Sequence, residues 1–212
     1  MRLYLPLLFI TTISVTACAP IMLATFASGA SVLADRRTVA VQTMDRSLQI
    51  EAQRALHKHF SNDKNVEISV FNRKILLTGI VTTAARKQDI EDLLRQEQNP
   101  REIINEITVT QALSKFSTQL SDASITSGVK TALIATRDVP SNSMRITTYA
   151  GVVYLMGLVT PNEGKAAAHV ASGVLGVQRV VKFFEYISEA DRQQMEKKSD
   201  SSNHSAAPQE KM

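Results

Sequence analysis

Apolar residues recur with helical spacing at the start of two separate stretches of the chain. In each stretch four of them fall at i, i+4, i+7 and i+8, which places them on one face of a helix. The first set is Leu48, Ala52, Ala55 and Leu56, and the second is Ile125, Val129, Ala132 and Leu133. Each predicted helix precedes an alternating pattern typical of a strand, with Val66, Ile68 and Val70 in the first stretch and Met144, Ile146 and Thr148 in the second.

A second predicted strand follows a short turn in both stretches, and here the sequence repeats itself. Residues 75–81 match residues 153–159, which lie 78 positions later. The turns before them, Asn72-Arg73-Lys74 and Ala150-Gly151, suit hairpins. Gly79 and Gly157 interrupt the two strands at the same place. A glycine inside a strand usually marks a bulge or the close approach of another backbone, and we expect these two glycines to be structural.

Each repeat closes with another helix and another strand. The helices show Ile90, Leu93 and Leu94 in one copy and Ala167, Val170 and Ala171 in the other, and the strands cover 103–109 and 180–187. Gly176 follows the second of these helices and Asn99-Pro100 the first, where each should end its helix with a left-handed residue. The order is therefore α-β-β-α-β, twice, which predicts an α+β chain of two tandem domains.

The N-terminus has the pattern of an export signal. Arg2 precedes an apolar run over 3–15, which is too short to span a bilayer but has the length of a signal-peptide core. The run ends in Val15-Thr16-Ala17-Cys18, which resembles the bacterial lipobox. We expect cleavage before Cys18 and lipidation of that cysteine with diacylglycerol and an N-acyl chain; a buried free cysteine after an ordinary cleavage site is the alternative. By the same resemblance, Ala19 favours the outer membrane.

Composition changes this picture little. Hydrophobic residues make up 44% of the chain, and aromatic residues 5%, with no Trp, which argues against a base-stacking platform for nucleic acid. The 24 basic side chains include Arg2, so 23 remain against 20 acidic ones in the mature chain, too mild an excess for a nucleic-acid binder. A single cysteine excludes an internal disulfide.

Residues that carry chemistry are scattered. His57 and His59 point to different faces of one predicted helix, so they do not share a metal. The carboxylates of Asp89, Glu91 and Asp92 stand beside Arg86, Lys87 and Arg95, which favours a solvated, salt-bridged face over an acid/base pair. No phosphate loop or nucleophile motif is present. We therefore expect a protein that is not an enzyme and binds neither a metal nor a cofactor.

Three segments resemble a known family. The segments VYLMGLVT (153–160) and HVASGVLGVQRVV (169–181) resemble a BON domain, and residues 35–42 resemble the segment that precedes the first such domain in dual-BON outer-membrane lipoproteins of the DolP/YraP-like family. The resemblance implies that each domain has a three-stranded mixed sheet packed on two helices. We expect five parts: signal peptide 1–17, lipidated tether 18–44, BON domain 1 at 45–111, BON domain 2 at 122–188 and disordered C-terminal tail 189–212, which begins with a charged helical stub to Lys198.

The resemblance also implies a function. Dual-BON lipoproteins support envelope integrity from the periplasmic side of the outer membrane and bind anionic phospholipid such as phosphatidylglycerol through the first helix of the second domain. The matching lipid-contact positions here are Ser127, Lys130, Thr131, Ile134 and Arg137. A solvated face with one stray isoleucine is the competing interpretation. Ser124 stands where the family has a large aromatic residue. The alternative function is a periplasmic adaptor that assists the outer-membrane protein assembly machinery.

Overall fold

The structure is a computed structural model that describes residues 35–61, 63, 65–111, 117–137 and 139–204. The predicted signal peptide, Cys18 and the tether up to residue 34 lie outside the described residues. Residues Leu33–Met212 form one compact unit, which contains both repeats.

The first repeat has the predicted order of elements. Helix α1 is followed by a hairpin, a second helix and a closing strand: α1 (Val39–His59), β1 (Val66–Phe71), β2 (Lys74–Val81), α2 (Ala84–Gln98) and β3 (Glu102–Val109). Strand β2 lies in the middle of the sheet, antiparallel to β1 and parallel to β3. The sheet is therefore mixed, as expected for an α-β-β-α-β unit.

The second repeat reproduces this arrangement with one added turn of 3₁₀ helix. Its elements are α3 (Ser117–Ala135), η1 (Ser141–Ser143), β4 (Met144–Tyr149), β5 (Val152–Val159), α4 (Pro161–Ser172) and β6 (Arg179–Tyr186). Strand β5 pairs antiparallel with β4 and parallel with β6. The predicted α+β fold with two three-stranded mixed sheets is confirmed.

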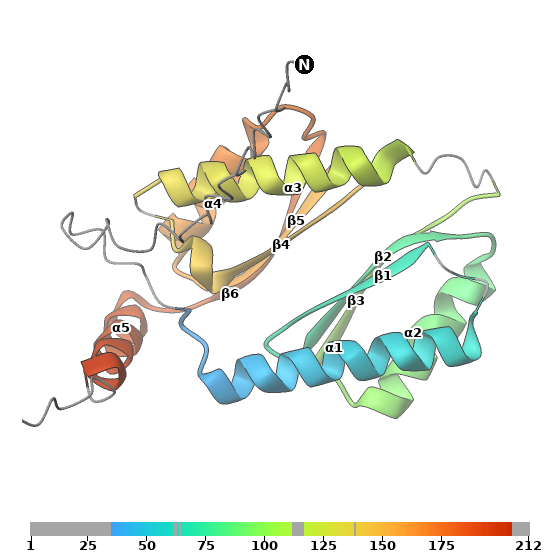
Figure 1. The fold of residues 1–212 in the computed structure, drawn as a ribbon, viewed down its shortest axis with the longest axis horizontal. Coiled ribbons are helices and arrows are strands. Elements are labelled where there is room, and N and C mark those ends of the chain that lie inside the picture. The colour runs from blue at the N-terminus through green and yellow to red at the C-terminus, as the bar shows by residue number, and fades with distance from the viewer. Residues whose placement is uncertain (1–34, 62, 64, 112–116, 138, 205–212) are drawn as a thin grey trace, which may run out of the picture. The chain divides into compact units, whose positions relative to one another are not determined.

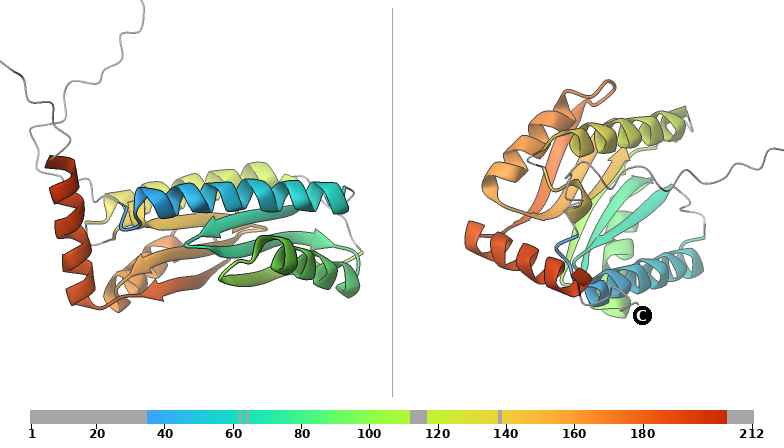
Figure 2. Two further views of the ribbon diagram at one scale, coloured as in Figure 1. Left: turned by 90° about the horizontal axis from the view of Figure 1, so that it is seen from below. Right: turned by 60° about the vertical axis from the view of Figure 1, so that its left-hand side comes forward.

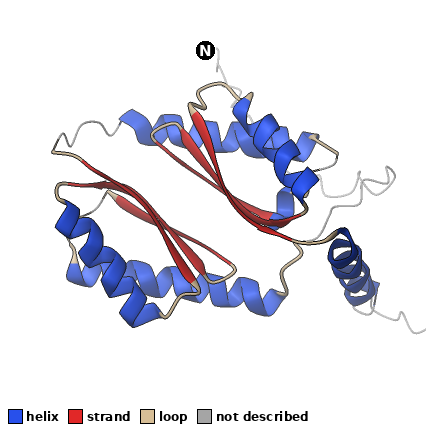
Figure 3. Cartoon of the chain, turned by 180° about the vertical axis from the view of Figure 1, so that it is seen from behind, coloured by secondary structure: helices blue, strands red, loops and turns tan. Residues whose placement is uncertain are grey.

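Two helices cover one face of each sheet (Figures 1 and 3). The predicted helix faces form the cores there: Ala52, Ala55 and Leu56 of α1 are buried against Ile90 and Leu94 of α2 and the strands between them. The second domain buries Ile125, Val129 and Leu133 of α3 in the same way against Ala167 and Ala171 of α4. The helical periodicity therefore identified the core of both domains.

The second face of each sheet is buried as well. A third cluster joins Phe71 and Leu76 of the first domain to Tyr154 and Met156 of the second. Beside it the hydroxyls of Ser69 and Thr147, equivalent positions 78 residues apart, form a hydrogen bond of 2.8 Å. Strands β2 and β5 are thus buried on both sides, which explains their unbroken apolar runs. Each fully buried side chain of this size stabilises the pair of domains by about 1.5–3 kcal/mol.

Both hairpins have two-residue turns with left-handed backbone. The φ angles are 50° and 61° at Asn72 and Arg73, and 50° and 74° at Ala150 and Gly151. Positive φ at both central positions defines the type I′ turn, whose twist matches that of paired strands. The predicted turns are therefore hairpin turns in both domains.

The end of α4 differs from the prediction. The helix ends at Ser172 and its C-cap is Gly173 in the right-handed helical conformation, so Gly176 does not cap it. Gly176 is instead a residue with φ of 90° in the following loop, where an added Cβ would lie 3.0 Å from Cγ1 of Ile125. In the first domain Asn99 does end α2 in the left-handed conformation, with φ of 42°.

The C-terminal segment begins with the predicted helical stub to Lys198, but the helix continues into the expected disordered tail, because 189–204 form helix α5 (Glu189–His204). Figure 2 shows α5 as a separate helix beyond the end of β6. Arg192 pairs with Glu189 one turn before it and with Glu196 one turn after it. Such pairs at i,i+3 and i,i+4 stabilise a helix whose sequence has few apolar residues. Residues 205–212 lie outside the described part of the chain.

Candidate functional site

The predicted lipid-contact residues lie on the exposed side of α3. Ser127, Lys130, Thr131 and Ile134 are all exposed, and Arg137 is exposed just beyond the helix. Ile134 has 59% of its surface accessible, whereas Val129 and Leu133 on the opposite side are fully buried. The structure therefore brings an apolar side chain and two cations together on one surface, which we call the α3 face.

The cations of the α3 face are available to an anion. Neither Lys130 nor Arg137 forms an ion pair with any residue in the described part of the chain. Within the described residues, no helix is long and apolar enough to cross a membrane. The α3 face can thus contact a charged surface, with one apolar side chain that projects from it.

A second exposed apolar residue lies next to α3 and was missed in the sequence. Leu175 is 95% exposed in the loop between α4 and β6. Its neighbours pack on α3. A Cβ added to Gly128 of α3 would lie 3.1 Å from the Val174 side chain, and a Cβ added to Gly176 would lie 3.0 Å from the Ile125 side chain of α3. The signal that marks this loop is an apolar pair between two glycines, Gly173-Val174-Leu175-Gly176.

The segment before α1, residues 35–38, contacts the first domain through Arg37, and we call it the lead-in segment. The Arg37 guanidinium lies 2.7 Å from a carboxylate oxygen of Asp45 and 2.7 Å from one of Asp35, and 4.0 Å from the centre of the Phe71 ring. Asp45 is itself buried and accepts hydrogen bonds from the backbone N–H groups of Asn72 and Arg73. One carboxylate therefore joins the incoming chain to the first hairpin.

The same segment is held by the second domain through Arg36. Its guanidinium, almost fully buried, donates to Glu163 at the start of α4, to Glu196 of α5 and to the backbone oxygen of Leu158. Burial alone would raise the pKa of Glu163, but hydrogen bonds from Arg36 and from the Thr160 backbone lower it below its ordinary value. Adjacent arginines thus tie the lead-in segment to both domains.

This arrangement predicts an acid-sensitive contribution to stability. A carboxyl whose folded pKa lies below its unfolded value of about 4.3 stabilises the fold fully above that value. The contribution is lost as the pH falls through the folded pKa. We expect Glu163→Gln to lower the free energy of unfolding at pH 7 by about 1–3 kcal/mol. Urea unfolding from pH 7 down to pH 3 should show the difference from wild type shrinking on acidification; a constant difference would contradict this account.

The second domain has a counterpart of Asp45 that the periodicity did not reveal. Asp122 is buried and accepts from the backbone N–H groups of Ala150 and Gly151, at 2.7 and 2.9 Å. The signal in the sequence is an aspartate three residues before the first apolar position of each core helix face. Both domains therefore pin their hairpin to their first helix with a buried carboxylate.

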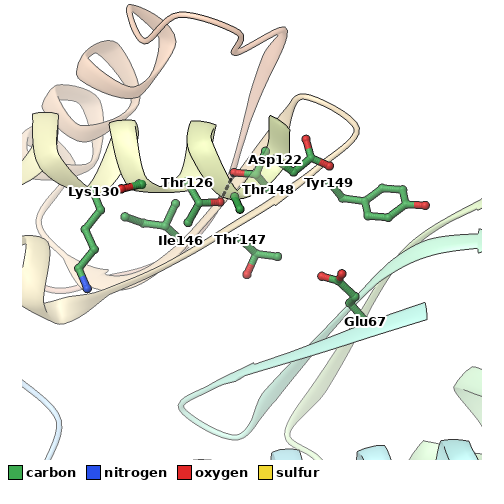
Figure 4. A pocket seen from close by; sticks show the side chains of 10 residues that line it. Glu67, Asp122, Thr126, Lys130, Ile146, Thr147, Thr148 and Tyr149 are labelled. Carbon is green, nitrogen blue, oxygen red and sulfur yellow. Dashed lines mark hydrogen bonds between the residues drawn. The ribbon is translucent and has the colours of Figure 1, made fainter. Parts of the chain in front are cut away.

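A pocket of about 670 Å³ opens beside Asp122 (Figure 4). Its walls come from α3 and β4 of the second domain and from Glu67 of β1. The lining residues are Glu67, Asp122, Ala123, Thr126, Ser127, Lys130, Ile146, Thr147, Thr148 and Tyr149. The Thr126 hydroxyl donates to that of Thr148 at 2.7 Å. Most of the polar lining is hydroxyl or carboxylate oxygen.

The acidic cluster on α2 forms an ion pair at the surface. Glu91 accepts from Arg95 at 2.6 Å and from the side chain of Asn105, and Asp92 accepts from Gln88. Burial would raise the pKa of Glu91, but these hydrogen bonds lower it. Over the described ranges no three His, Cys, Asp or Glu side chains gather closely enough to hold a metal ion.

Comparison with known proteins agrees with this architecture. The BON domain family matches residues 45–111 and 121–188. Outer membrane lipoprotein DolP of Haemophilus influenzae is 29% identical over 185 residues, which cover 86% of this chain and 95% of that protein. The 21 kDa hemolysin of Actinobacillus pleuropneumoniae is 28% identical, over 72% of this chain and 79% of that protein. The chain therefore belongs to the BON domain family and carries two BON domains in tandem.

Proposed function

We propose that this protein is an outer-membrane lipoprotein without enzymatic activity, which supports envelope integrity by binding anionic phospholipid through BON domain 2. The observation that carries the proposal is the exposed Ile134 on the same face as Lys130 and Arg137. The relative from Haemophilus influenzae is named an outer membrane lipoprotein, which supports the location. The lipobox-like sequence at Cys18 supports lipid anchoring on the periplasmic side.

The chemistry of the α3 face suits a phospholipid surface. Ile134 supplies an apolar side chain on this face and Leu175 supplies one in the loop beside α3, and each gains about 1.5–3 kcal/mol if fully withdrawn from water. Lys130 and Arg137 supply cations, each worth about 1 kcal/mol close to an anionic membrane. Leu175, in the loop between α4 and β6, also offers a second apolar side chain beside α3, the helix in which Ser124 stands in place of the aromatic residue of the family. Together these groups support selective but modest binding.

Lipid on Cys18 would make such modest binding sufficient. Each buried CH₂ of an acyl chain contributes about 0.8 kcal/mol, so two or three chains anchor durably. Once anchored, the protein meets the bilayer at the high effective concentration of an intramolecular contact. The anchor then determines where the protein resides, and the α3 face determines which lipid it contacts.

Replacing Ile134 with aspartate tests the proposed contact. We expect at least a tenfold loss of binding to phosphatidylglycerol vesicles, because the change removes an inserted side chain and adds a repelled charge. The measurement is flotation of residues 33–212 with vesicles. Met44→Asp is the matched control, because Met44 is 53% exposed on α1 and should be neutral. Equal binding by wild type and Ile134→Asp would contradict the proposal, and crosslinks to an assembly partner would then favour the adaptor function.

A further inference from the structure

The two domains provide an internal comparison of the space beside each hairpin. Asp45 and Asp122 hold the two turns in the same way. The 78-residue spacing makes Phe71 the equivalent of Tyr149. In the first domain a cation completes the group, since the Arg37 guanidinium contacts both the Asp45 carboxylate and the face of Phe71. We call the buried aspartate and the aromatic residue at the hairpin the constellation. In the first domain the constellation binds a cation.

Among the described residues of the second domain, no arginine takes the equivalent place. Asp122 and Tyr149 line the open pocket, and neither forms an ion pair or a cation–π contact within the described residues. The two aspartates, like the buried faces of α1 and α3, are 77 residues apart. At this spacing the residue that matches Arg37 is Ser114, which is not basic and lies outside the described residues. The constellation is therefore present without its own arginine.

The side chain that each domain contributes to the constellation of the other also differs in charge: it is an arginine at the first constellation and a glutamate at the second. Arg145 of β4 reaches toward the first constellation, where it donates to Gln49 and the Val70 oxygen. Its equivalent is Glu67, which lines the pocket beside Asp122 and Tyr149 (Figure 4). Glu67 and Asp122 therefore place two carboxylates in the lining of one pocket, and burial and the charge of Asp122 raise the pKa of Glu67. The first constellation thus has Arg37 and Arg145 beside it, whereas the second has Glu67 at the position equivalent to Arg145.

We propose that the pocket binds the primary ammonium of an amino-phosphate such as phosphoethanolamine, between Asp122, Glu67 and the ring of Tyr149. The ammonium takes the place that the Arg37 guanidinium has in the first domain, where an aromatic face and a carboxylate stabilise a cation together. Lys130, drawn at the other end of the pocket from Glu67 in Figure 4, would bind the phosphate. The volume of about 670 Å³ is within the usual range for a small-molecule site.

The amino-phosphate can be free in solution or the headgroup of an aminophospholipid, and both present the same ammonium. This site shares Lys130 with the α3 face, but it does not include Ile134, which makes the proposed outward contact with anionic lipid. Either proposal can fail alone, because Glu67 lies on β1 of the first domain and Ile134 on α3.

Titration of residues 33–212 with phosphoethanolamine, followed by calorimetry or NMR shifts, tests the site. We expect saturable binding that Glu67→Gln and Tyr149→Leu each weaken at least tenfold, while Glu51→Gln, which removes an exposed carboxylate on α1, leaves it unchanged. Glycerol phosphate, which carries the phosphate without the ammonium, should not bind. Absent binding, or binding that ignores Glu67→Gln, or equal binding of glycerol phosphate would overturn the proposal.

Two further arms complete the test. Lys115 is the nearest basic residue before Asp122 in the sequence and lies outside the described residues. Binding that appears only in Lys115→Ala would mean that the chain fills its own pocket, which also overturns the proposal. Phosphatidylcholine vesicles with and without phosphatidylethanolamine then separate the two sources of the ammonium. If the protein binds the phosphatidylethanolamine vesicles and Glu67→Gln abolishes this, the ligand is a lipid headgroup. If it binds only soluble phosphoethanolamine, the ligand is free in solution.

Discussion

Replacing Asp45 with alanine should lower the free energy of unfolding by about 3–5 kcal/mol, because it breaks a buried ion pair and leaves the other partners unsatisfied. The Asp45 side chain pairs with Arg37 and accepts two backbone N–H groups at the left-handed turn of the first hairpin. Without it the hairpin loses its attachment to α1, and the lead-in segment loses one of its two domain contacts. Urea unfolding of residues 33–212 measures the change.

Asp122→Ala is the matched control for this prediction. Asp122 also binds two backbone N–H groups, but it has no arginine partner among the described residues. Its loss should cost about 2–3 kcal/mol, since only the two charge-assisted hydrogen bonds disappear. If the two aspartates cost the same, Arg37 contributes nothing to the first site; if Asp45→Ala costs less than about 1 kcal/mol, the proposed attachment is wrong.

Gly79→Ala should be the second strongly destabilising change, by about 3–5 kcal/mol from backbone strain and steric overlap together. Gly79 has φ of 132°, which L residues rarely adopt. An added Cβ would lie 2.1 Å from the backbone oxygen of Asn65 and 2.8 Å from Cα of Val66. Because both are backbone atoms at the start of the paired strand β1 or just before it, the hairpin itself has to move.

Gly157→Ala is the control that separates the effect of backbone strain at Gly79 from the effect of replacing any strand glycine with alanine. Gly157 is not among the residues with positive φ, and its added Cβ would meet the side chain of Met144 and the oxygen of Ser143, both at 3.0 Å. Part of this contact can relax, so we expect a cost of about 1–2 kcal/mol. Equal losses at Gly79 and Gly157 in thermal or urea unfolding would rule out a special role for the backbone at Gly79.

The sequence predicted the elements well because both cores follow simple periods. The i, i+4, i+7, i+8 pattern found the buried faces of α1 and α3, and the repeat around Gly79 and Gly157 found the central strands. It did not show what covers the other face of each sheet. The continuous apolar run in β2 indicates burial on both sides, but a run alone does not identify Tyr154 and Met156 as partners of Phe71 and Leu76.

The polar contacts were less accessible from the sequence. Arg36 and Arg37 belong to a segment similar to the family, yet Glu163 lies 127 residues after Arg36 and meets it only in three dimensions. Asp45 is only eight residues from Arg37, but the helical periodicity does not mark this pair. Gly176 matched a helix-capping pattern, but α4 ends earlier because its loop folds back on α3. Composition favoured disorder after Ser188, and it does not register the pairs of Arg192 that stabilise α5.

The most direct test of the central claim is a flotation series with residues 33–212 and vesicles of increasing phosphatidylglycerol content, each at several salt concentrations. The account predicts that the bound fraction rises with anionic lipid and falls as salt increases, because screening shortens the Debye length from about 30 Å at 0.01 M to about 10 Å at 0.1 M. Absence of binding at every lipid composition, or binding that salt leaves unchanged, would contradict it.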